Sequence, residues 1–374
     1  MGELYFMTKG LTVGYNGKPL IRDIEFGVER GEILTLIGPN GSGKSTILKS
    51  ITKQLKILAG TVYIAEDDLK TVSAKELAKK MSVVLTERMK PELMSCRDIV
   101  ATGRYPYTGN LGLLSEEDEA IVQQSMESVH VLDLQNRDFN AISDGQRQRV
   151  LLARALCQQP EIIILDEPTS FLDIRHKLEL LSLLRKLTKE RGIAVIMSLH
   201  EIDLAQKVSD KVICVKGEII ARYGTPAEVF QEETIRKLYG IENGTYDPLF
   251  GSIELGRPQG TPEILVLSNG GSGIPVYRDL QKQGTPFAAA ILSTNDMDYA
   301  VARHMATEIV TAAPFRPITE EALDRTMALV RSCKEVIDAG VTIGQTNQAM
   351  EEILAEAERL GKRKKAKQHD VLPV

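Results

Sequence analysis

The sequence predicts an α/β protein built from two domains, each with a parallel sheet covered by helices. Short aliphatic runs such as Ile162–Leu165 alternate with longer segments of helical periodicity, the pattern of buried strands joined by helical crossovers. This alternation stops over residues 251–262, which hold three glycines and two prolines, and resumes at Glu263. We therefore predict a first domain over residues 1–250, a linker over 251–262, a second domain over 263–361 and a basic tail over 362–374.

The composition is that of an ordinary soluble globular protein. Of 374 residues, 43% are apolar and 26% are charged, and the net charge of −5 argues against bulk nucleic-acid binding. The four cysteines are far apart and form no C-x-x-C pair, so we expect neither a zinc site nor a disulfide framework. No apolar run is long enough to span a bilayer and no signal peptide begins the chain, so we expect any work at a membrane to require a partner.

A glycine-rich segment in the first domain has the pattern of a phosphate-binding loop. Residues 38–46 match G-x-x-x-x-G-K-[ST] and lie between a predicted strand, 32–37, and a predicted helix that starts at Ser45. Glycines let the backbone N–H groups point at phosphate oxygens, and the helix N-terminus adds partial positive charge. Lys44 is expected to reach the β and γ phosphates, and the Ser45 hydroxyl to ligate Mg²⁺. The predicted nucleotide-binding residues are Gly38, Pro39, Asn40, Gly41, Ser42, Gly43, Lys44, Ser45 and Thr46.

Two further strands end in residues that suit triphosphate chemistry. Asp166 and Glu167 follow the aliphatic run Ile162–Leu165, at the carboxyl end where α/β sheets hold ligands. Asp166 is expected to reach Mg²⁺, directly or through water, and Glu167 to deprotonate the attacking water. The apolar run 194–199 ends at His200, for which we expect a contact with the γ-phosphate. Taken alone, the acidic pair would also fit an ordinary strand-to-loop exit.

A second helix N-terminus decides the class of this nucleotide site. Ile142–Gln146 precedes a run of helical periodicity, and Ser143 is a good N-cap. Together with the glycine-rich loop, the acidic strand end, Ser170–Asp173 and His200, this segment resembles ABC transporter ATP-binding subunits in order and approximate spacing. The resemblance covers about the first 250 residues, and Tyr15 matches the aromatic residue that stacks on adenine.

The resemblance implies a fold, a reaction and partners. The fold is a RecA-like core with a helical subdomain, and the reaction is hydrolysis of ATP to ADP and phosphate with Mg²⁺. Each ATP would be sandwiched in a homodimer, with Ser143, Gly145 and Gln146 of one subunit facing the nucleotide held by the other. The expected partners are integral-membrane permease subunits and, indirectly, a substrate-binding protein. These partners place the protein peripherally at the cytoplasmic face of the cell membrane.

Two positions depart from the family pattern. Asp144 stands where the family has the first of two glycines, and we expect its carboxylate to point away from the phosphates because of charge repulsion. Glu87 falls on the position of the family's Mg²⁺-sensing glutamine. An acid there would either ligate Mg²⁺ or be an ordinary loop residue, and both readings stay open.

The leading subclass is an importer of iron–siderophore, haem or cobalamin. Residues 97–107, 199–205 and 224–230 resemble the corresponding segments of these type II importers, and residues 87–107 would receive the permease's coupling helix. The alternative is a soluble ABC ATPase of DNA repair or translation. Such proteins usually carry a coiled-coil insertion, zinc cysteines or a second cassette, which this sequence lacks. A P-loop kinase would not explain Ile142–Gln146 or His200.

The second domain is predicted to be a small Rossmann-like α/β domain. Its predicted strands are 263–267, 287–292, 308–311 and 335–338, and its predicted helices are 274–282, 299–306, 320–332 and 346–360. A candidate second ligand site comprises Gly270, Gly271, Gly273 and Asp296, although Val276 stands where the dinucleotide fingerprint needs its third glycine. The alternative is a docking domain without a small ligand. The basic tail is predicted to be solvated, with attraction to anionic headgroups as the second reading.

Overall fold

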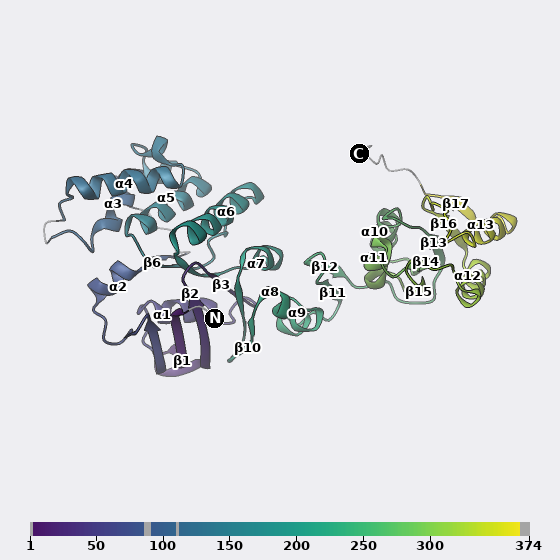
Figure 1. Cartoon of the computed structure of the whole chain (residues 1–374), viewed down its shortest axis with the longest axis horizontal. Coiled ribbons are helices and arrows are strands. Elements are labelled where there is room, and N and C mark those ends of the chain that lie inside the picture. The colour runs from purple at the N-terminus through teal and green to yellow at the C-terminus, as the bar shows by residue number, and fades with distance from the viewer. Residues whose placement is uncertain (1–2, 86–90, 110–111, 367–374) are drawn as a thin grey trace. The chain divides into compact units, whose positions relative to one another are not determined.

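The computed structural model describes residues 3–85, 91–109 and 112–366 and divides the chain into two compact units (Figure 1). The first unit comprises Met1–Gly240 and Pro248–Ser252, and the second comprises Ile241–Asp247 and Ile253–Val374. Within the described residues, no helix is long and apolar enough to cross a membrane.

A six-stranded sheet forms the centre of the first unit, in the order β10-β9-β3-β8-β7-β6. Its strands are β3 (Ile33–Ile37), β6 (Met81–Val84), β7 (Ile162–Leu165), β8 (Ala194–Ser198), β9 (Lys211–Lys216) and β10 (Ile219–Gly224). All neighbours are parallel except β10, which pairs antiparallel with β9. Every residue of β3, β7 and β8 is buried, which explains their unbroken aliphatic character.

A second, antiparallel sheet in this unit has the order β2-β1-β4-β5. Its strands are β1 (Leu4–Tyr15), β2 (Lys18–Glu29), β4 (Ala59–Ile64) and β5 (Asp67–Asp68). Helix α1 (Lys44–Ile51) shares one hydrophobic core with both sheets, through Ile47, Leu48 and Ile51. The glycine-rich loop is therefore fixed between a central strand, β3, and a buried helix.

Three of the remaining helices of the first unit form a helical subdomain. The three helices α3, α4 and α5 pack side by side as the helical subdomain (Figure 1). The helices are α2 (Ala74–Lys80), α3 (Cys96–Ala101), α4 (Glu116–Ser128), α5 (Asp144–Cys157), α6 (Ile174–Arg191), α7 (Ile202–Val208), α8 (Pro226–Val229) and α9 (Glu232–Tyr239), with short 3₁₀ turns at η1 (Thr102–Arg104), η2 (Leu132–Leu134) and η3 (Phe139–Ala141). Helices α3, α4 and α5 each begin with a serine in a capping box, which satisfies their first N–H groups.

The second unit is a five-stranded parallel sheet with helices on both faces. Its strand order is β15-β14-β13-β16-β17, so the order reverses between β13 and β16. The elements are β13 (Ile264–Leu267), α10 (Ile274–Gln283), β14 (Phe287–Ser293), α11 (Met297–Met305), β15 (Glu308–Ala312), α12 (Glu320–Ser332), β16 (Glu335–Asp338), α13 (Met350–Arg359) and β17 (Arg363–Lys365). One core contains residues of α10 and α11, and the other contains residues of α12 and α13. The Rossmann-like prediction is confirmed.

Two predicted irregular segments contain strands. Within the predicted linker, β12 (Ser252–Leu255) pairs with β11 (Gly244–Asp247) in a hairpin. Within the predicted basic tail, β17 pairs in parallel with β16, while Lys364 and Lys365 are exposed to solvent. The side chain of Arg363 also donates to Asp338 over 2.8 Å. Short polar edge strands lack the apolar pattern by which strands are recognised in a sequence.

Candidate active site

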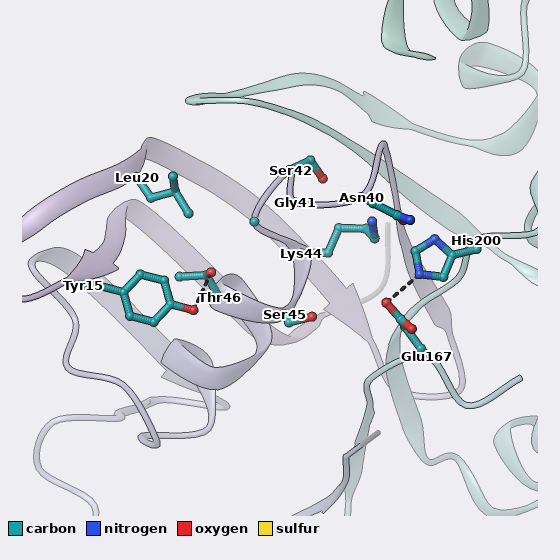
Figure 2. Close-up of a pocket in the computed structure, with 11 residues that line it drawn as sticks. Tyr15, Leu20, Asn40, Gly41, Ser42, Lys44, Ser45, Thr46, Glu167 and His200 are labelled. Carbon is teal, nitrogen blue, oxygen red and sulfur yellow. Dashed lines mark hydrogen bonds and ion pairs between the residues drawn. The ribbon is translucent and has the colours of Figure 1, made fainter. Parts of the chain in front are cut away.

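A pocket opens at the N-terminus of α1, between the glycine-rich loop and the ends of β7 and β8 (Figure 2). The residues that line it are Tyr15, Leu20, Asn40, Gly41, Ser42, Gly43, Lys44, Ser45, Thr46, Glu167 and His200. Leu20 is the one lining residue that the sequence reasoning did not name. Gly38 and Pro39 belong to the same loop, where their carbonyls accept hydrogen bonds from Lys44.

The backbone of the loop requires glycine. Gly43 has a φ of 100°, and a Cβ there would come within 2.6 Å of the Ile21 side chain. The neighbouring Ser42 hydroxyl is buried without a hydrogen-bond partner among the described residues. An unpartnered buried hydroxyl is costly unless something else bonds to it, and a phosphate oxygen is such an acceptor.

Lys44 is held inside the loop. Its side chain is 5% exposed, and its Nζ donates to the carbonyl oxygens of Gly38 at 2.8 Å and Pro39 at 3.1 Å. Burial lowers the pKa of the Lys44 ammonium group, and the nearby Glu167 and Asp166 carboxylates oppose that shift. A bound polyphosphate would restore the charged form by direct pairing.

Ser198 connects the two acidic residues at the end of β7. Its hydroxyl donates to Asp166 Oδ1 at 2.7 Å and accepts the Glu167 N–H at 2.8 Å. The Ser45 hydroxyl donates to the same Asp166 oxygen at 3.1 Å. Sequence reasoning missed Ser198, and the only signal for it is a hydroxyl at the end of an otherwise apolar strand.

The pair Ser45 and Asp166 presents two oxygen donors side by side, which fits a Mg²⁺ site. Mg²⁺ usually takes one or two protein oxygens and completes its shell with water and substrate phosphates. The described residues contain no group of three His, Cys, Asp or Glu side chains that could hold a metal ion. The third predicted ligand, Glu87, lies outside the described residues.

Glu167 is paired on both carboxylate oxygens. His200 Nε2 lies 2.5 Å from Oε1, and the Ser170 hydroxyl donates to Oε2 at 3.0 Å. The backbone of Glu167 has a φ of 48°, a strained conformation of the kind that clusters at functional sites. The geometry thus brings the predicted base and the predicted histidine together at the pocket wall (Figure 2).

Tyr15 lies at the edge of the same pocket. It is 49% exposed, and its hydroxyl lies 3.0 Å from Thr46 Oγ1 (Figure 2). That contact anchors the phenol at one end and leaves an aromatic surface open to solvent beside the phosphate loop. An exposed flat ring at this place suits stacking on a base.

The predicted signature residues do not line this pocket. Ser143 and Gln146 form the capping box of α5, with the Gln146 N–H donating to Ser143 Oγ at 3.3 Å and the Ser143 N–H to Gln146 Oε1 at 3.1 Å. Gly145 has no room for a side chain, because a Cβ would lie 2.8 Å from the His176 ring. The Asp144 carboxylate accepts from Arg147 at 2.7 Å, which offsets its charge. The predicted signature residues and the pocket are therefore two separate places in one chain.

The residues of the candidate second site lie together, but backbone N–H groups of its glycines are already hydrogen-bonded to carboxylates of the same unit. The Gly270 N–H donates to both Asp296 carboxylate oxygens, at 3.1 and 3.0 Å. The Gly273 N–H donates at 3.1 Å to Asp298, a fully buried residue whose carboxyl pKa is raised by burial. A phosphate would have to displace these carboxylates, and the Gly271 backbone, which has a φ of 91°, also hydrogen-bonds to Asp298. A ligand for these residues stays a prediction.

The fold and the pocket together define a P-loop ATPase. The ABC transporter family model matches residues 21–170, and an MJ0874 family model matches residues 287–367. An uncharacterized ABC transporter ATP-binding protein of Methanocaldococcus jannaschii is 44% identical over 276 residues, covering 74% of this chain and 95% of that protein. The chain belongs to the ABC transporter ATP-binding proteins and is an ABC-type ATPase.

Two further relatives have more specific names. The iron(3+)-hydroxamate import ATP-binding protein FhuC of Bacillus subtilis is 35% identical over 235 residues, or 63% of this chain and 87% of its own. The cobalamin import ATP-binding protein BtuD of Halobacterium salinarum is 31% identical over 314 residues, or 82% of this chain and 78% of its own. Among solved structures, the dimeric post-hydrolysis state of the cassette MJ0796 with ADP and phosphate has a TM-score of 0.52 at 27% identity, covering 59% of this chain and 98% of that chain.

Proposed function

We propose that this protein is the ATP-hydrolysing subunit of an ABC importer and that it acts as a homodimer on membrane permease subunits. The observation that carries the proposal is the separation of the site within one chain. The pocket holds Lys44, Glu167 and His200, whereas Ser143 and Gly145 lie at the start of α5 and do not line it. A second copy would bring its α5 to the open side of the nucleotide. The dimeric structure of a related cassette supports this arrangement.

In the proposed reaction the chain mainly positions charge. Ser45 and Asp166 would hold Mg²⁺, which when bound offsets the charge of the phosphates. Lys44 would pair with the β and γ phosphates. Glu167 would accept the proton of the attacking water, and His200, 2.5 Å from it, would orient the carboxylate and the γ-phosphate.

We further propose that the cargo is a cobalamin-like corrinoid. The FhuC alignment of 235 residues is no longer than the first unit, whereas the BtuD alignment of 314 residues exceeds that unit and must extend into the second. Part of the second unit thus aligns with a protein named for cobalamin import, which supports a corrinoid over an iron chelate or haem. The named relatives are import proteins, so the alternative of a soluble repair or translation ATPase is not favoured. A permease partner would place the protein peripherally at the cytoplasmic face of the membrane, next to a substrate-binding protein.

The dimer is tested with Glu167→Gln, which should bind ATP and Mg²⁺ without hydrolysing it. We expect light scattering after gel filtration to give twice the monomer mass with ATP and the monomer mass with ADP. Adding Ser143→Arg as a control should abolish the dimer and leave ATP binding unchanged, because the bulky cation would block only the second copy's contact. A Glu167→Gln protein that stays monomeric at saturating ATP would refute the proposal.

The cargo is tested with the protein reconstituted with its permease and binding protein in vesicles. We expect ATP hydrolysis to rise when the binding protein is loaded with cobalamin and not when it is exposed to ferric hydroxamate. Stimulation by the ferric chelate alone would replace the corrinoid proposal with the iron-chelate alternative.

A further inference from the structure

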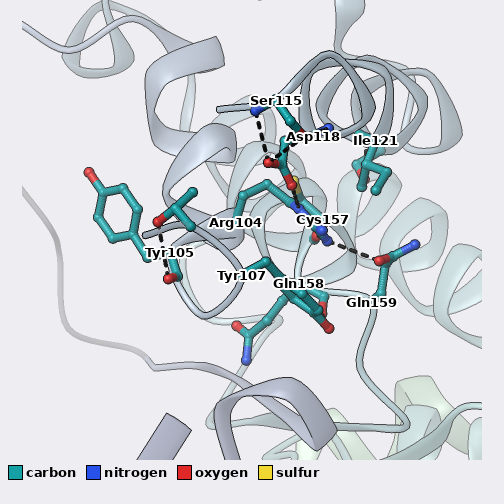
Figure 3. Close-up of polar contacts among 11 residues, drawn as sticks. Arg104, Tyr105, Tyr107, Ser115, Asp118, Ile121, Cys157, Gln158 and Gln159 are labelled. Carbon is teal, nitrogen blue, oxygen red and sulfur yellow. Dashed lines mark hydrogen bonds and ion pairs between the residues drawn. The ribbon is translucent and has the colours of Figure 1, made fainter. Parts of the chain in front are cut away.

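Arg104 is a buried cation that joins three elements of the helical subdomain (Figure 3). It is 4% exposed and ends η1, directly after α3. Its Nε donates to Asp118 Oδ1 at 2.7 Å, and its Nη1 donates to the Cys157 carbonyl at 2.9 Å and to Gln159 Oε1 at 3.0 Å. A buried guanidinium is costly unless its donors are satisfied, so these partners hold one another in a narrow range of positions.

The acidic partner is itself immobilised. Asp118 lies in the first turn of α4, where its Oδ2 accepts the Ser115 N–H at 3.0 Å and the Ser115 hydroxyl at 2.8 Å. The Ser115 N–H, followed by Arg104, lowers the pKa of the Asp118 carboxyl. Asp118 therefore stays charged near neutral pH, and the guanidinium is attached to a fixed point.

The other end of the contact is the C-terminus of α5. Cys157 is the last residue of α5, and its carbonyl lies at the negative end of the helix, where a cation is favourable. The backbones also touch, because a Cβ on Gly103 would lie 2.4 Å from the Arg154 carbonyl oxygen. Since α5 has 14 residues, it is about 21 Å long, and Ser143 caps the opposite end.

The same cluster ties α5 to the central sheet. The Tyr107 hydroxyl donates to the Gln158 carbonyl at 3.0 Å, and the Arg104 guanidinium stacks 3.9 Å from the Tyr107 ring centroid. Gln158 Nε2 donates to the Met81 carbonyl at 2.7 Å, at the start of β6. The C-terminal end of α5 is thus held by hydrogen bonds to both η1 and β6.

From this geometry we infer that Arg104 is a positioning residue for ATP hydrolysis. By fixing the C-terminal end of α5, it sets where Ser143 and Gly145 at the other end meet the nucleotide of the second copy. The inference rests on the proposed dimer. Arg104 lies in the segment 87–107, which is expected to receive a permease helix, so its contacts would connect that segment to the signature residues through α5.

The test uses the full chain in the Glu167→Gln background and measures two quantities. One is the Kd of ATP for the monomer at low protein concentration, and the other is the dissociation constant of the ATP-bound dimer by sedimentation. We expect Arg104→Met to change monomer ATP binding by less than about twofold and to weaken the dimer by about tenfold or more, equal to about 1.4 kcal/mol. Arg97→Met is the matched control, because Arg97 pairs with Glu119 and so joins α3 to α4.

A double variant, Arg104→Met/Asp118→Leu, tests whether misfolding explains the loss of dimerisation. It replaces the buried pair with apolar side chains and should remain folded. It should unfold near the temperature of the parent yet still dimerise about tenfold more weakly. Dimerisation within twofold of the parent, or an equal loss of monomer ATP binding, would overturn the inference. If the Glu167→Gln parent itself fails to dimerise with ATP, the proposed function falls first and this inference with it.

Discussion

Ser198→Ala removes the one hydroxyl that orients both acidic residues of the ATP site. In the structure Ser198 is fully buried, donates to Asp166 and accepts from the Glu167 amide. After the substitution, Asp166 loses the 2.7 Å bond from Ser198 and keeps the 3.1 Å bond from the Ser45 hydroxyl, and the Glu167 amide loses the Ser198 acceptor. The acid that would hold Mg²⁺ and the base that would activate water both become less fixed.

The size of the effect follows from these two bonds. A hydrogen bond to a carboxylate contributes about 1.5–3 kcal/mol, and an unsatisfied buried amide costs about 1–3 kcal/mol. Because the Glu167 amide is only partly buried, we expect the lower part of the sum, about 2.5–3 kcal/mol, in the free energy of unfolding. If half or more of that loss appears in the transition state, the hydrolysis rate falls by about 10- to 100-fold.

Steady-state phosphate release measures kcat, and a fluorescent ATP analogue measures nucleotide binding. We expect Ser198→Ala to lower kcat strongly and to change nucleotide affinity little, because Lys44 and the loop amides are untouched. Ser198→Thr is the control, since it keeps the hydroxyl and should recover much of the rate if the added methyl group is accommodated. A Ser198→Ala enzyme whose kcat stays within twofold of the parent would refute this reading of the site.

Two other predictions concern Lys44 and the second unit. Burial lowers the pKa of Lys44 in the free protein, and phosphate charge raises it again, so ATP binding should take up protons at any pH alkaline enough to deprotonate part of the free Lys44. Calorimetry in buffers of different ionisation enthalpy would detect this uptake, which Lys44→Met should abolish. Gly273→Ala would place a Cβ 2.5 Å from Ser268 Oγ and from the Tyr277 ring, so thermal unfolding of the full chain should show a loss of about 1–3 kcal/mol in the second unit. Gly344→Ala, whose nearest neighbour is 3.8 Å away, is its control and should be nearly neutral; equal stability of the two variants would contradict the prediction.

The parts of the site that sequence predicted share one property: their chemistry lies in contiguous residues. The glycine-rich loop and the pair Asp166 and Glu167 can each be recognised in the sequence, because their residues are neighbours that perform one task. The role of Ser198 could not be recognised in the sequence, because it arises only when β8 lies beside β7. The contact of Arg104 with the Cys157 carbonyl likewise depends on the packing of residues 53 positions apart in the chain.

The same reasoning explains the fold. The aliphatic strands β13 and β14 were predicted because burial on both faces demands a continuous apolar run. Strands β12 and β17 were missed because both are short and partly exposed, and their hydrogen-bonding partners decide their structure. An edge strand is specified by the neighbour that it pairs with rather than by its own composition.

The arrangement of the first unit implies where ATP hydrolysis is controlled. The pocket residues lie in the glycine-rich loop, at strand ends and on α1. Helix α1 and both sheets share one hydrophobic core, which holds the pocket residues in place. The signature residues lie at the start of α5, whose far end is held by Arg104 and Gln158. If a second copy must supply those residues, the position of α5 decides whether the site is complete. Control of hydrolysis would then act on this helix, and the pocket itself would not need to change.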